Sequence, residues 1–266
     1  MTPDPFAAHQ YEYRAIVGVD TKSFTGNPSS RQPYLSARIP AVLEEAFDRS
    51  GLAEAWKNAR FPQDTGDGHV VGTDPRWLPS LVSPFPDVLQ EVLEKEDAHL
   101  RAIDRNLRMR LRVSIHAGLL PDSGQGLRTD GKGKPMNDAH RLLDSTPVRD
   151  ALKDSDPDVT LVAVIISQHV FENFVQEHFS RLHPSRLKPV EARVEGKVFA
   201  EQAWLYVPKP STGHPGDDAG DPARPDPAPP TPSASGGTVV TGNSGAVAWN
   251  NSAGGDFNQS VGGDGR

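Results

Sequence analysis

The sequence predicts an α+β domain in which helices cover one face of a mixed sheet. Strand-like and helix-like apolar patterns alternate along residues 8–207. With 266 residues and 36% hydrophobic content, the chain can bury one sizeable core and still leave a tail. Near residue 207 the composition changes, because proline, glycine, serine and aspartate replace large apolar side chains. We therefore expect one folded domain over residues 8–207, followed by segments of a different kind.

The first half of this domain begins with a predicted strand at residues 13–19. Residues 35–47 then repeat apolar side chains at helical spacing, with Gly51 as a C-terminal stop. Gly66-Asp67-Gly68 precedes a short apolar run, which predicts a tight hairpin turn leading into a strand. A second amphipathic helix is expected over residues 88–103.

The second half continues with a half-buried strand over residues 108–115, where arginine or serine alternates with apolar residues. A glycine-rich loop, residues 121–135, follows it. The remaining expected elements, in chain order, are helices at 136–144 and 148–152, an apolar strand at 159–167, a helical stretch at 170–179 and a closing hairpin at 190–207.

The overall composition excludes several classes of protein. The chain has no cysteine, so it has no disulfides and no thiolate metal site, which fits a reducing cytoplasm. A net charge of −7 argues against a nucleic-acid-binding surface. The longest apolar run, residues 161–166, is too short to span a bilayer, and the N-terminus has no signal-peptide pattern. We expect a cytoplasmic protein that binds neither nucleic acid nor membrane.

Two carboxylates stand at the ends of predicted strands. Asp20 ends the buried run of residues 15–19, and Asp67 occupies the tip of the predicted hairpin. Aspartate and glycine also form good turns by themselves, which is the ordinary explanation of Gly66-Asp67-Gly68. However, two carboxylates that meet across adjacent strands are what a two-metal phosphoryl-transfer site requires. Without a histidine or cysteine cluster beside them, they suit Mg²⁺ or Mn²⁺ rather than zinc.

Short motifs extend this pattern along the chain. They are Asp20-Thr21-Lys22-Ser23-Phe24-Thr25, Gly66-Asp67-Gly68, Arg112-Val113-Ser114-Ile115-His116-Ala117-Gly118, Gly133-Lys134-Pro135-Met136-Asn137-Asp138-Ala139-His140-Arg141 and Val164-Ile165-Ile166-Ser167. Together, and in this order, they resemble the catalytic domain of class III nucleotidyl cyclases, the adenylyl and guanylyl cyclases, in particular a bacterial subgroup of stand-alone cyclase-like domains. The resemblance implies a palm-type, ferredoxin-like sheet and conversion of an NTP to a 3′,5′-cyclic NMP and pyrophosphate.

The resemblance also implies roles for individual residues. Asp20 and Asp67 would hold two Mg²⁺ or Mn²⁺ ions, while Asn137 would orient the ribose and Arg141 would stabilise the transition-state phosphate. The further substrate-binding residues that it implies are Phe24, Thr25 and Gly26, through their backbone amides, Asp130, as a base-reading residue, and Lys197, as a phosphate contact. Each of the last two, like Asn137 and Arg141, is also explained as an ordinary solvated residue. A head-to-tail homodimer is implied as well, with one chain's aspartates facing the other chain's Asn137 and Arg141.

One part of the family pattern is missing. The base-reading lysine expected before the hairpin is replaced by Arg60-Phe61-Pro62-Gln63, so the sequence leaves purine and pyrimidine nucleotides open. A catalytically silent cyclase-like scaffold is therefore the alternative function.

The C-terminal part has two sections. Residues 208–237 contain nine prolines and no large apolar side chain, which predicts a disordered linker. Residues 238–263 contain two β-prone pieces rich in Asn, Gly and Val. Their Gln259-Ser260-Val261-Gly262 resembles the Gln-x-Val-Gly core of bacterial amyloid signalling (RHIM-like) motifs. That resemblance implies an assembly segment that recruits an effector protein with a similar motif; the alternative is a flexible end.

Overall fold

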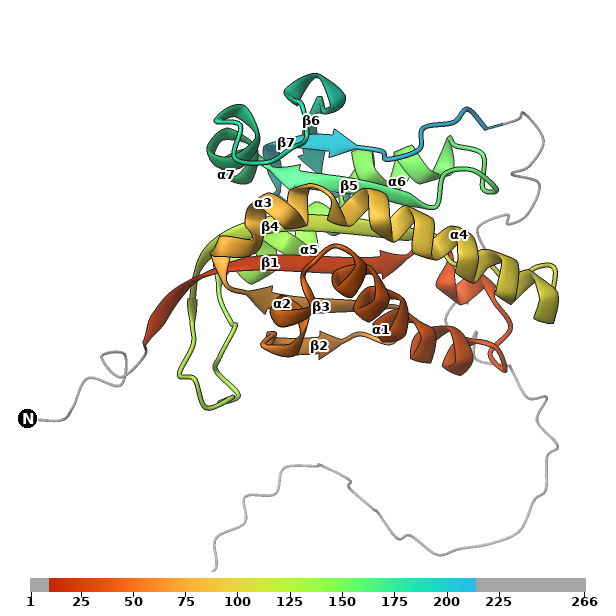
Figure 1. The fold of residues 1–266 in the computed structure, drawn as a ribbon, viewed down its shortest axis with the longest axis horizontal. Helices are drawn as coiled ribbons and strands as arrows, with labels where there is room; N and C mark the ends of the chain where they lie inside the picture. Colours follow the sequence, from red (N-terminus) through yellow and green to blue (C-terminus); the bar gives the residue numbers. More distant parts are fainter. Residues whose placement is uncertain (1–9, 214–266) are drawn as a thin grey trace, which may run out of the picture. The chain divides into compact units, whose positions relative to one another are not determined.

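The computed structural model describes residues 10–213 of the chain. The predicted assembly segment and most of the predicted linker lie outside these residues. Within them, seven strands form one mixed sheet in the order β2-β3-β1-β4-β5-β7-β6 (Figure 1). The strands are β1 (Tyr11–Thr21), β2 (Arg60–Asp64), β3 (Gly68–Thr73), β4 (Leu111–Pro121), β5 (Val162–Ser167), β6 (Lys188–Arg193) and β7 (Ala200–Tyr206).

The helices connect these strands. They are α1 (Gln32–Arg49), α2 (Ala53–Lys57), α3 (Leu78–Val82), α4 (Phe85–Ile103), α5 (Lys134–Asp144), α6 (Thr146–Lys153) and α7 (Gln168–Val170), with 3₁₀ turns η1 (Phe24–Gly26), η2 (Pro75–Trp77) and η4 (Pro184–Arg186) and a π-helical turn η3 (Phe171–Gln176). The β4–β5 pair is parallel and the other paired strands are antiparallel, so the predicted α+β class with a mixed sheet is confirmed.

The helices differ from the prediction in one respect, because they cover both faces of the sheet rather than one. Ala15, Val17 and Val19 of β1 belong to the core that α1 and α4 close. Ile16 points the other way and packs with Met136 of α5. Strands β1 and β5 are apolar at successive positions, and such runs are buried on both faces.

The central strand β4 is also more deeply buried than its alternating sequence suggested. Ser114 is fully buried and Arg110 is 5% exposed, although a half-buried strand was expected here. The reason is that β1 and β5 pair with both edges of β4 while α5 lies over one face.

Helix α5 lies close to β1 and β4 because glycines leave room for it. A Cβ on Gly118 would lie 2.6 Å from Pro135, at the start of α5. A Cβ on Gly18 would lie 3.6 Å from Leu143, near the end of α5. The C-terminal end of α5 therefore approaches the same end of β1 that carries Asp20.

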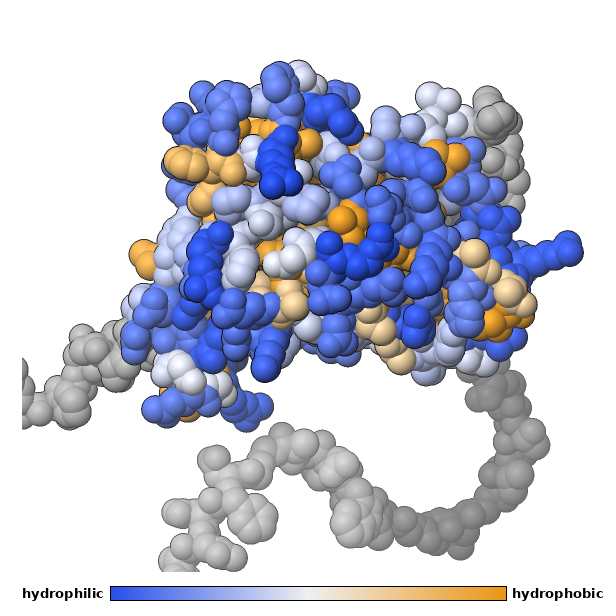
Figure 2. All heavy atoms as spheres, viewed as in Figure 1, coloured by the Kyte–Doolittle hydropathy of each residue, from blue (hydrophilic) through white to orange (hydrophobic). Residues whose placement is uncertain are grey.

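The opposite face presents α1 and α4 to solvent. Figure 2 shows this face as mostly hydrophilic, with small separate apolar areas. None of the helices within residues 10–213 is long and apolar enough to cross a membrane.

Candidate active site

The structure brings Asp20 and Asp67 to adjacent backbone positions. Asp20 lies opposite Gly68 in the antiparallel β1–β3 pair. The carbonyl of Asp67 accepts a hydrogen bond from the amide of Thr21 at 2.9 Å. A Cβ on Gly68 would lie 2.3 Å from the carbonyl oxygen of Val19, so only glycine allows the hairpin to approach β1 this closely.

The two aspartates in the hairpin have different environments. Asp64 accepts the amide of Gly66 at 2.9 Å, so Asp64 supplies the side chain that forms the turn. The carboxylate of Asp67 accepts a hydrogen bond from Thr65 Oγ1 at 3.2 Å and is half-buried. Turn formation therefore accounts for Asp64 and leaves the carboxylate of Asp67 available to a ligand.

Asp20 forms an ion pair with Arg112 of β4, which lies opposite it in the sheet. Their side chains are only 16% and 14% exposed, respectively. Burial lowers the pKa of Arg112, and the nearby Arg149 lowers it further. The Nε atom of Arg112 is buried and has no hydrogen-bond partner among residues 10–213. This guanidinium therefore neutralises Asp20 and retains one unused donor.

The donor chemistry at this position fits Mg²⁺ or Mn²⁺ delivered with a polyphosphate. Asp20 and Asp67 supply only hard carboxylate oxygens. In the described part of the chain, no group of three or more His, Cys, Asp or Glu residues is arranged to hold a metal. Mg²⁺ is commonly held by one or two carboxylates together with substrate phosphates, so a pair of aspartates is sufficient for that mode of binding.

A hollow of about 320 Å³ is lined by Arg112, the ion-pair partner of Asp20, although neither Asp20 nor Asp67 lines it. Its basic side chains are Lys22, Arg112, Arg149 and Lys153, and its acidic ones are Asp144, Asp150 and Glu195. Arg149 and Lys153 lie four residues apart on α6 and form no ion pair with any described residue. These cations were not among the site residues predicted from the sequence. Two features of the sequence indicate them: a lysine inside the motif that begins at Asp20, and two basic residues spaced four apart at a predicted helix.

The predicted phosphate cradle is formed in part. Ser23 adopts a left-handed conformation (φ 57°) and starts the η1 turn. The amide of Gly26 donates to the carbonyl of Ser23 at 3.1 Å, so it is already used inside the turn. The amides of Phe24 and Thr25 have no acceptor among residues 10–213, which leaves two of the three predicted donors available.

Asn137 and Arg141 lie on the outer face of α5, as their spacing predicts. Arg141 pairs with Asp138 at 3.3 Å, and its guanidinium lies 5.6 Å from the ring centre of Phe199. Arg141 lines a hollow of about 740 Å³ together with Lys197, which is itself 3.7 Å from Asp144.

Asn137 lines a different hollow, of about 520 Å³, together with Asp130. Like the hollow of about 320 Å³, neither this hollow nor the one lined by Arg141 and Lys197 includes Asp20 or Asp67. Within one chain the predicted site residues therefore form separate groups: the two aspartates with the η1 turn, Arg141 with Lys197, and Asn137 with Asp130.

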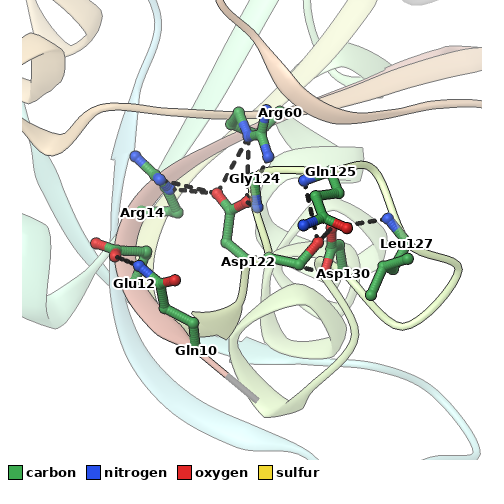
Figure 3. A network of polar contacts seen from close by, with 10 residues as sticks. Gln10, Glu12, Arg14, Arg60, Asp122, Gly124, Gln125, Leu127 and Asp130 are labelled. Atoms are coloured by element: carbon green, nitrogen blue, oxygen red, sulfur yellow. Dashed lines mark hydrogen bonds and ion pairs between the residues drawn. The ribbon is translucent and has the colours of Figure 1, made fainter. Parts of the chain in front are cut away.

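The carboxylate of Asp130 is occupied by its own loop. It accepts hydrogen bonds from the amide of Ser123 at 3.0 Å, from Ser123 Oγ at 2.7 Å and from the amide of Leu127 at 2.9 Å (Figure 3). The hydrogen bonds from Ser123 hold the pKa of Asp130 below its ordinary value. These contacts give Asp130 a structural role in the loop between β4 and α5.

Arg60 begins the segment Arg60-Phe61-Pro62-Gln63, within which the resemblance called for a base-reading lysine. Its Nη2 atom lies 2.5 Å from Asp122, which also pairs with Arg14 at 2.8 Å (Figure 3). Burial alone would raise the pKa of Asp122, but the hydrogen bonds from Arg60 and Gly124 hold it below its ordinary value. Arg60 thus ties β2 to the end of β4.

No family model matches the chain, and no curated protein sequence matches it. The structure is similar to the adenylyl cyclase CyaB from P. aeruginosa, with a TM-score of 0.50 and 16% identity over 74% of this chain and 94% of that chain. It is also similar to an adenylate cyclase structure from Trypanosoma brucei, with a TM-score of 0.51 and 13% identity over 73% of this chain and 88% of that chain. At this identity the similarity establishes the fold, which is the palm fold of these cyclase domains.

Proposed function

We propose that the chain is a metal-dependent nucleotidyl cyclase that converts an NTP to a 3′,5′-cyclic NMP and pyrophosphate. The observation that carries this proposal is the juxtaposition of Asp20 and Asp67, together with the basic side chains, Arg149 and Lys153 among them, that line a hollow beside the Asp20 partner Arg112. The fold shared with adenylyl cyclases supports it.

In this reaction the 3′-oxygen bonds to the α-phosphorus, the bond from that phosphorus to the β-phosphate oxygen breaks, and the 3′-hydroxyl proton leaves to solvent. Asp20 and Asp67 would hold Mg²⁺ or Mn²⁺, which supplies charge neutralisation of the triphosphate and a lowered pKa of the 3′-hydroxyl. Arg149 and Lys153 line the hollow, form no ion pair with another residue of the described range 10–213, and would bind phosphate oxygens. The free amides of Phe24 and Thr25 would add two more donors.

We further propose that the working unit is a homodimer. The resemblance to class III cyclases implies this pairing, and within one chain Asn137 lines a hollow with Asp130 and Arg141 lines one with Lys197. In a head-to-tail pair, Asp20 and Asp67 would face Asn137 of the partner subunit, for the ribose, and Arg141 of the partner subunit, for the transferring phosphate. The planar donors of arginine suit the second role.

A catalytically silent scaffold is the second candidate function. It is favoured by the ion pairs that occupy functional groups in the isolated chain, namely Asp20 with Arg112 and Arg141 with Asp138. In this alternative the domain would present residues 238–263 to an effector without turning over nucleotide.

We also propose, from the sequence, that residues 238–263 assemble by cross-β stacking and recruit an effector with a similar segment in a bacterial signalling or defence system. A peptide of residues 236–266 should form thioflavin-positive fibres. Replacing Phe257 and Val261 with aspartate should prevent assembly, because buried like charges would repeat every ~4.8 Å. A peptide that stays monomeric at high concentration would contradict this proposal.

The decisive test of metal binding uses two substitutions in one hairpin. Asp67→Asn removes a charge with little change of volume, so it should abolish pyrophosphate release from NTP and Mn²⁺ while leaving the melting temperature unchanged. Asp64→Asn is the matched control, because the amide oxygen can still accept the Gly66 amide. It should keep most of the parent activity. If Asp67→Asn keeps most of its activity, the assignment of Asp67 to the metal is wrong.

A further inference from the structure

The chain continues beyond the last strand as an ordered strap, which we define as residues 208–213. The strap lies against the turn of residues 154–160, which joins α6 to β5. Thr160 is fully buried, and its hydroxyl donates to the carbonyl of Lys209 at 2.6 Å. The same hydroxyl lies 2.7 Å from Ser211 Oγ. A threonine inside the domain thus fastens the first part of the strap.

The far end of the strap forms hydrogen bonds with the main chain of the same turn. Ser211 Oγ accepts the amide of Asp156 at 3.0 Å, and the amide of Gly213 donates to the carbonyl of Asp154 at 2.8 Å. A Cβ on Gly213 would lie only 3.0 Å from that carbonyl, so glycine suits this close approach. The strap therefore follows the turn along most of its length.

Arg110 holds the same turn from inside the domain. This arginine is 5% exposed, and its Nε atom donates to the carbonyl of Thr160 at 2.9 Å. Its Nη2 atom donates to Ser155 Oγ, also at 2.9 Å. Because Thr160 contacts both the strap and Arg110, the position of the strap and the position of Arg110 depend on each other.

Arg110 connects in turn to the end of β1. Its carbonyl accepts the amide of Lys22 at 2.8 Å, and Lys22 is the second residue after Asp20. The side chain of Lys22 also reaches the carbonyl of Leu152, at 3.4 Å, in α6 just before the turn. Hydrogen bonds made by Thr160 and Arg110 therefore connect the strap to Lys22, which lies two residues beyond the aspartate proposed as a metal ligand.

We propose that the strap is a positioning element for the Asp20 end of β1, so that its docking sets the metal affinity of the proposed active site. The inference rests on the proposed function only in that Asp20 would bind metal. The chain continues from Gly213, so a partner that binds or pulls the following residues acts first on the strap. Coupling through such contiguous contacts requires that a change at one end be measurable at the other.

The test uses the full chain with Ser211→Ala, and Thr160→Val as a second variant that removes the hydroxyl from the domain side. Mn²⁺ binding is measured by electron paramagnetic resonance in the presence of inorganic triphosphate, which supplies the phosphate ligands of the proposed site. Hydrogen exchange is measured at the Lys22 amide and in residues 154–160. Both variants should lower the Mn²⁺ affinity by roughly threefold to thirtyfold, the usual range for such couplings. They should also speed exchange at both places.

Two controls separate positioning from general stability. Ser211→Thr keeps the hydroxyl and should restore the parent values. Thr212→Ala removes the hydroxyl of the exposed neighbouring residue. Suppose that Ser211→Ala and Thr160→Val speed hydrogen exchange only in residues 154–160, and leave the exchange rate of the Lys22 amide and the Mn²⁺ affinity unchanged. The strap then stabilises the turn of residues 154–160 and does not position β1. The same conclusion follows if Thr212→Ala acts like Ser211→Ala.

If the parent's Mn²⁺ affinity does not depend on Asp67, the proposed function fails. Hydrogen exchange at the Lys22 amide still decides the role of the strap.

Discussion

His116 is a half-buried histidine on β4, inside the motif that resembles a cyclase strand. Burial lowers its pKa to about 4, and the attraction of Asp138 opposes this only in part. Its Nδ1 atom has no hydrogen-bond partner among residues 10–213. The imidazole is therefore neutral at neutral pH and acts as a packing group, which agrees with the absence of a histidine metal pattern in the sequence.

His116 should make stability depend on pH. Its pKa is lowered on folding, so its full contribution is present above the unfolded value of 6.5 and is lost as pH falls toward the folded value of about 4. Relative to His116→Leu, the parent should lose up to about 1.4 kcal/mol of unfolding free energy per pH unit in that window. Urea titrations at several pH values measure this difference. Parallel pH profiles for the two proteins would show that His116 is not buried in its neutral form.

At the residue scale, the sequence indicated that Asp20 and Asp67 lie at the ends of neighbouring strands, because a buried strand ends abruptly in one and a glycine-flanked turn carries the other. Their role as metal ligands stays a prediction. It could not reveal the Asp20–Arg112 pair, which depends on the register of β1 against β4. It also could not separate a base-reading Asp130 from a loop-forming one, because both need the same carboxylate in the same loop.

The loop between β4 and α5 is the element in which these two explanations of Asp130 make different predictions. If the carboxylate serves the loop, Asp130→Asn and Ser123→Ala should both speed hydrogen exchange over residues 123–130, because each weakens the same contacts. They should also change the turnover of all NTPs by similar factors. A shift in the preferred base with Asp130→Asn, absent from Ser123→Ala, would instead assign base reading to Asp130.

At the element scale, most strands and helices followed from apolar periodicity and turn residues, as in α1, α4 and the hairpin between β2 and β3. Apolar periodicity did not predict that helices cover both faces of the sheet. It shows which side of a helix is apolar, and not which face of a sheet the helix covers. The arginines that alternate through residues 108–115 gave a misleading sign of exposure, since Arg110 is buried and hydrogen-bonded and Arg112 is ion-paired with only 14% of its side chain exposed.

The whole molecule is expected to work in pairs, which a mixing experiment can test. Asp67→Asn and Arg141→Ala should each be inactive alone, with the loss of one transition-state donor at Arg141 costing on the order of 10²–10³ in rate. Mixed together, the two variants should recover activity, because each heterodimer contains one composite site with all native residues.

The control for this experiment is a fluorescence energy-transfer signal between differently labelled variants, which shows that the subunits exchange. A mixture that exchanges subunits and remains as inactive as its parents would argue against a site shared between two chains.

The measurement that tests the central claim most directly is product identification with the full chain. Purified protein is incubated with Mn²⁺ and each of the four NTPs in turn, and the products are resolved by mass. We predict that at least one NTP yields its 3′,5′-cyclic monophosphate and an equal amount of pyrophosphate, and that Asp67→Asn yields neither. Four unchanged NTPs, from a folded dimer with saturating metal, would contradict the cyclase proposal and leave the silent scaffold as the function of this domain.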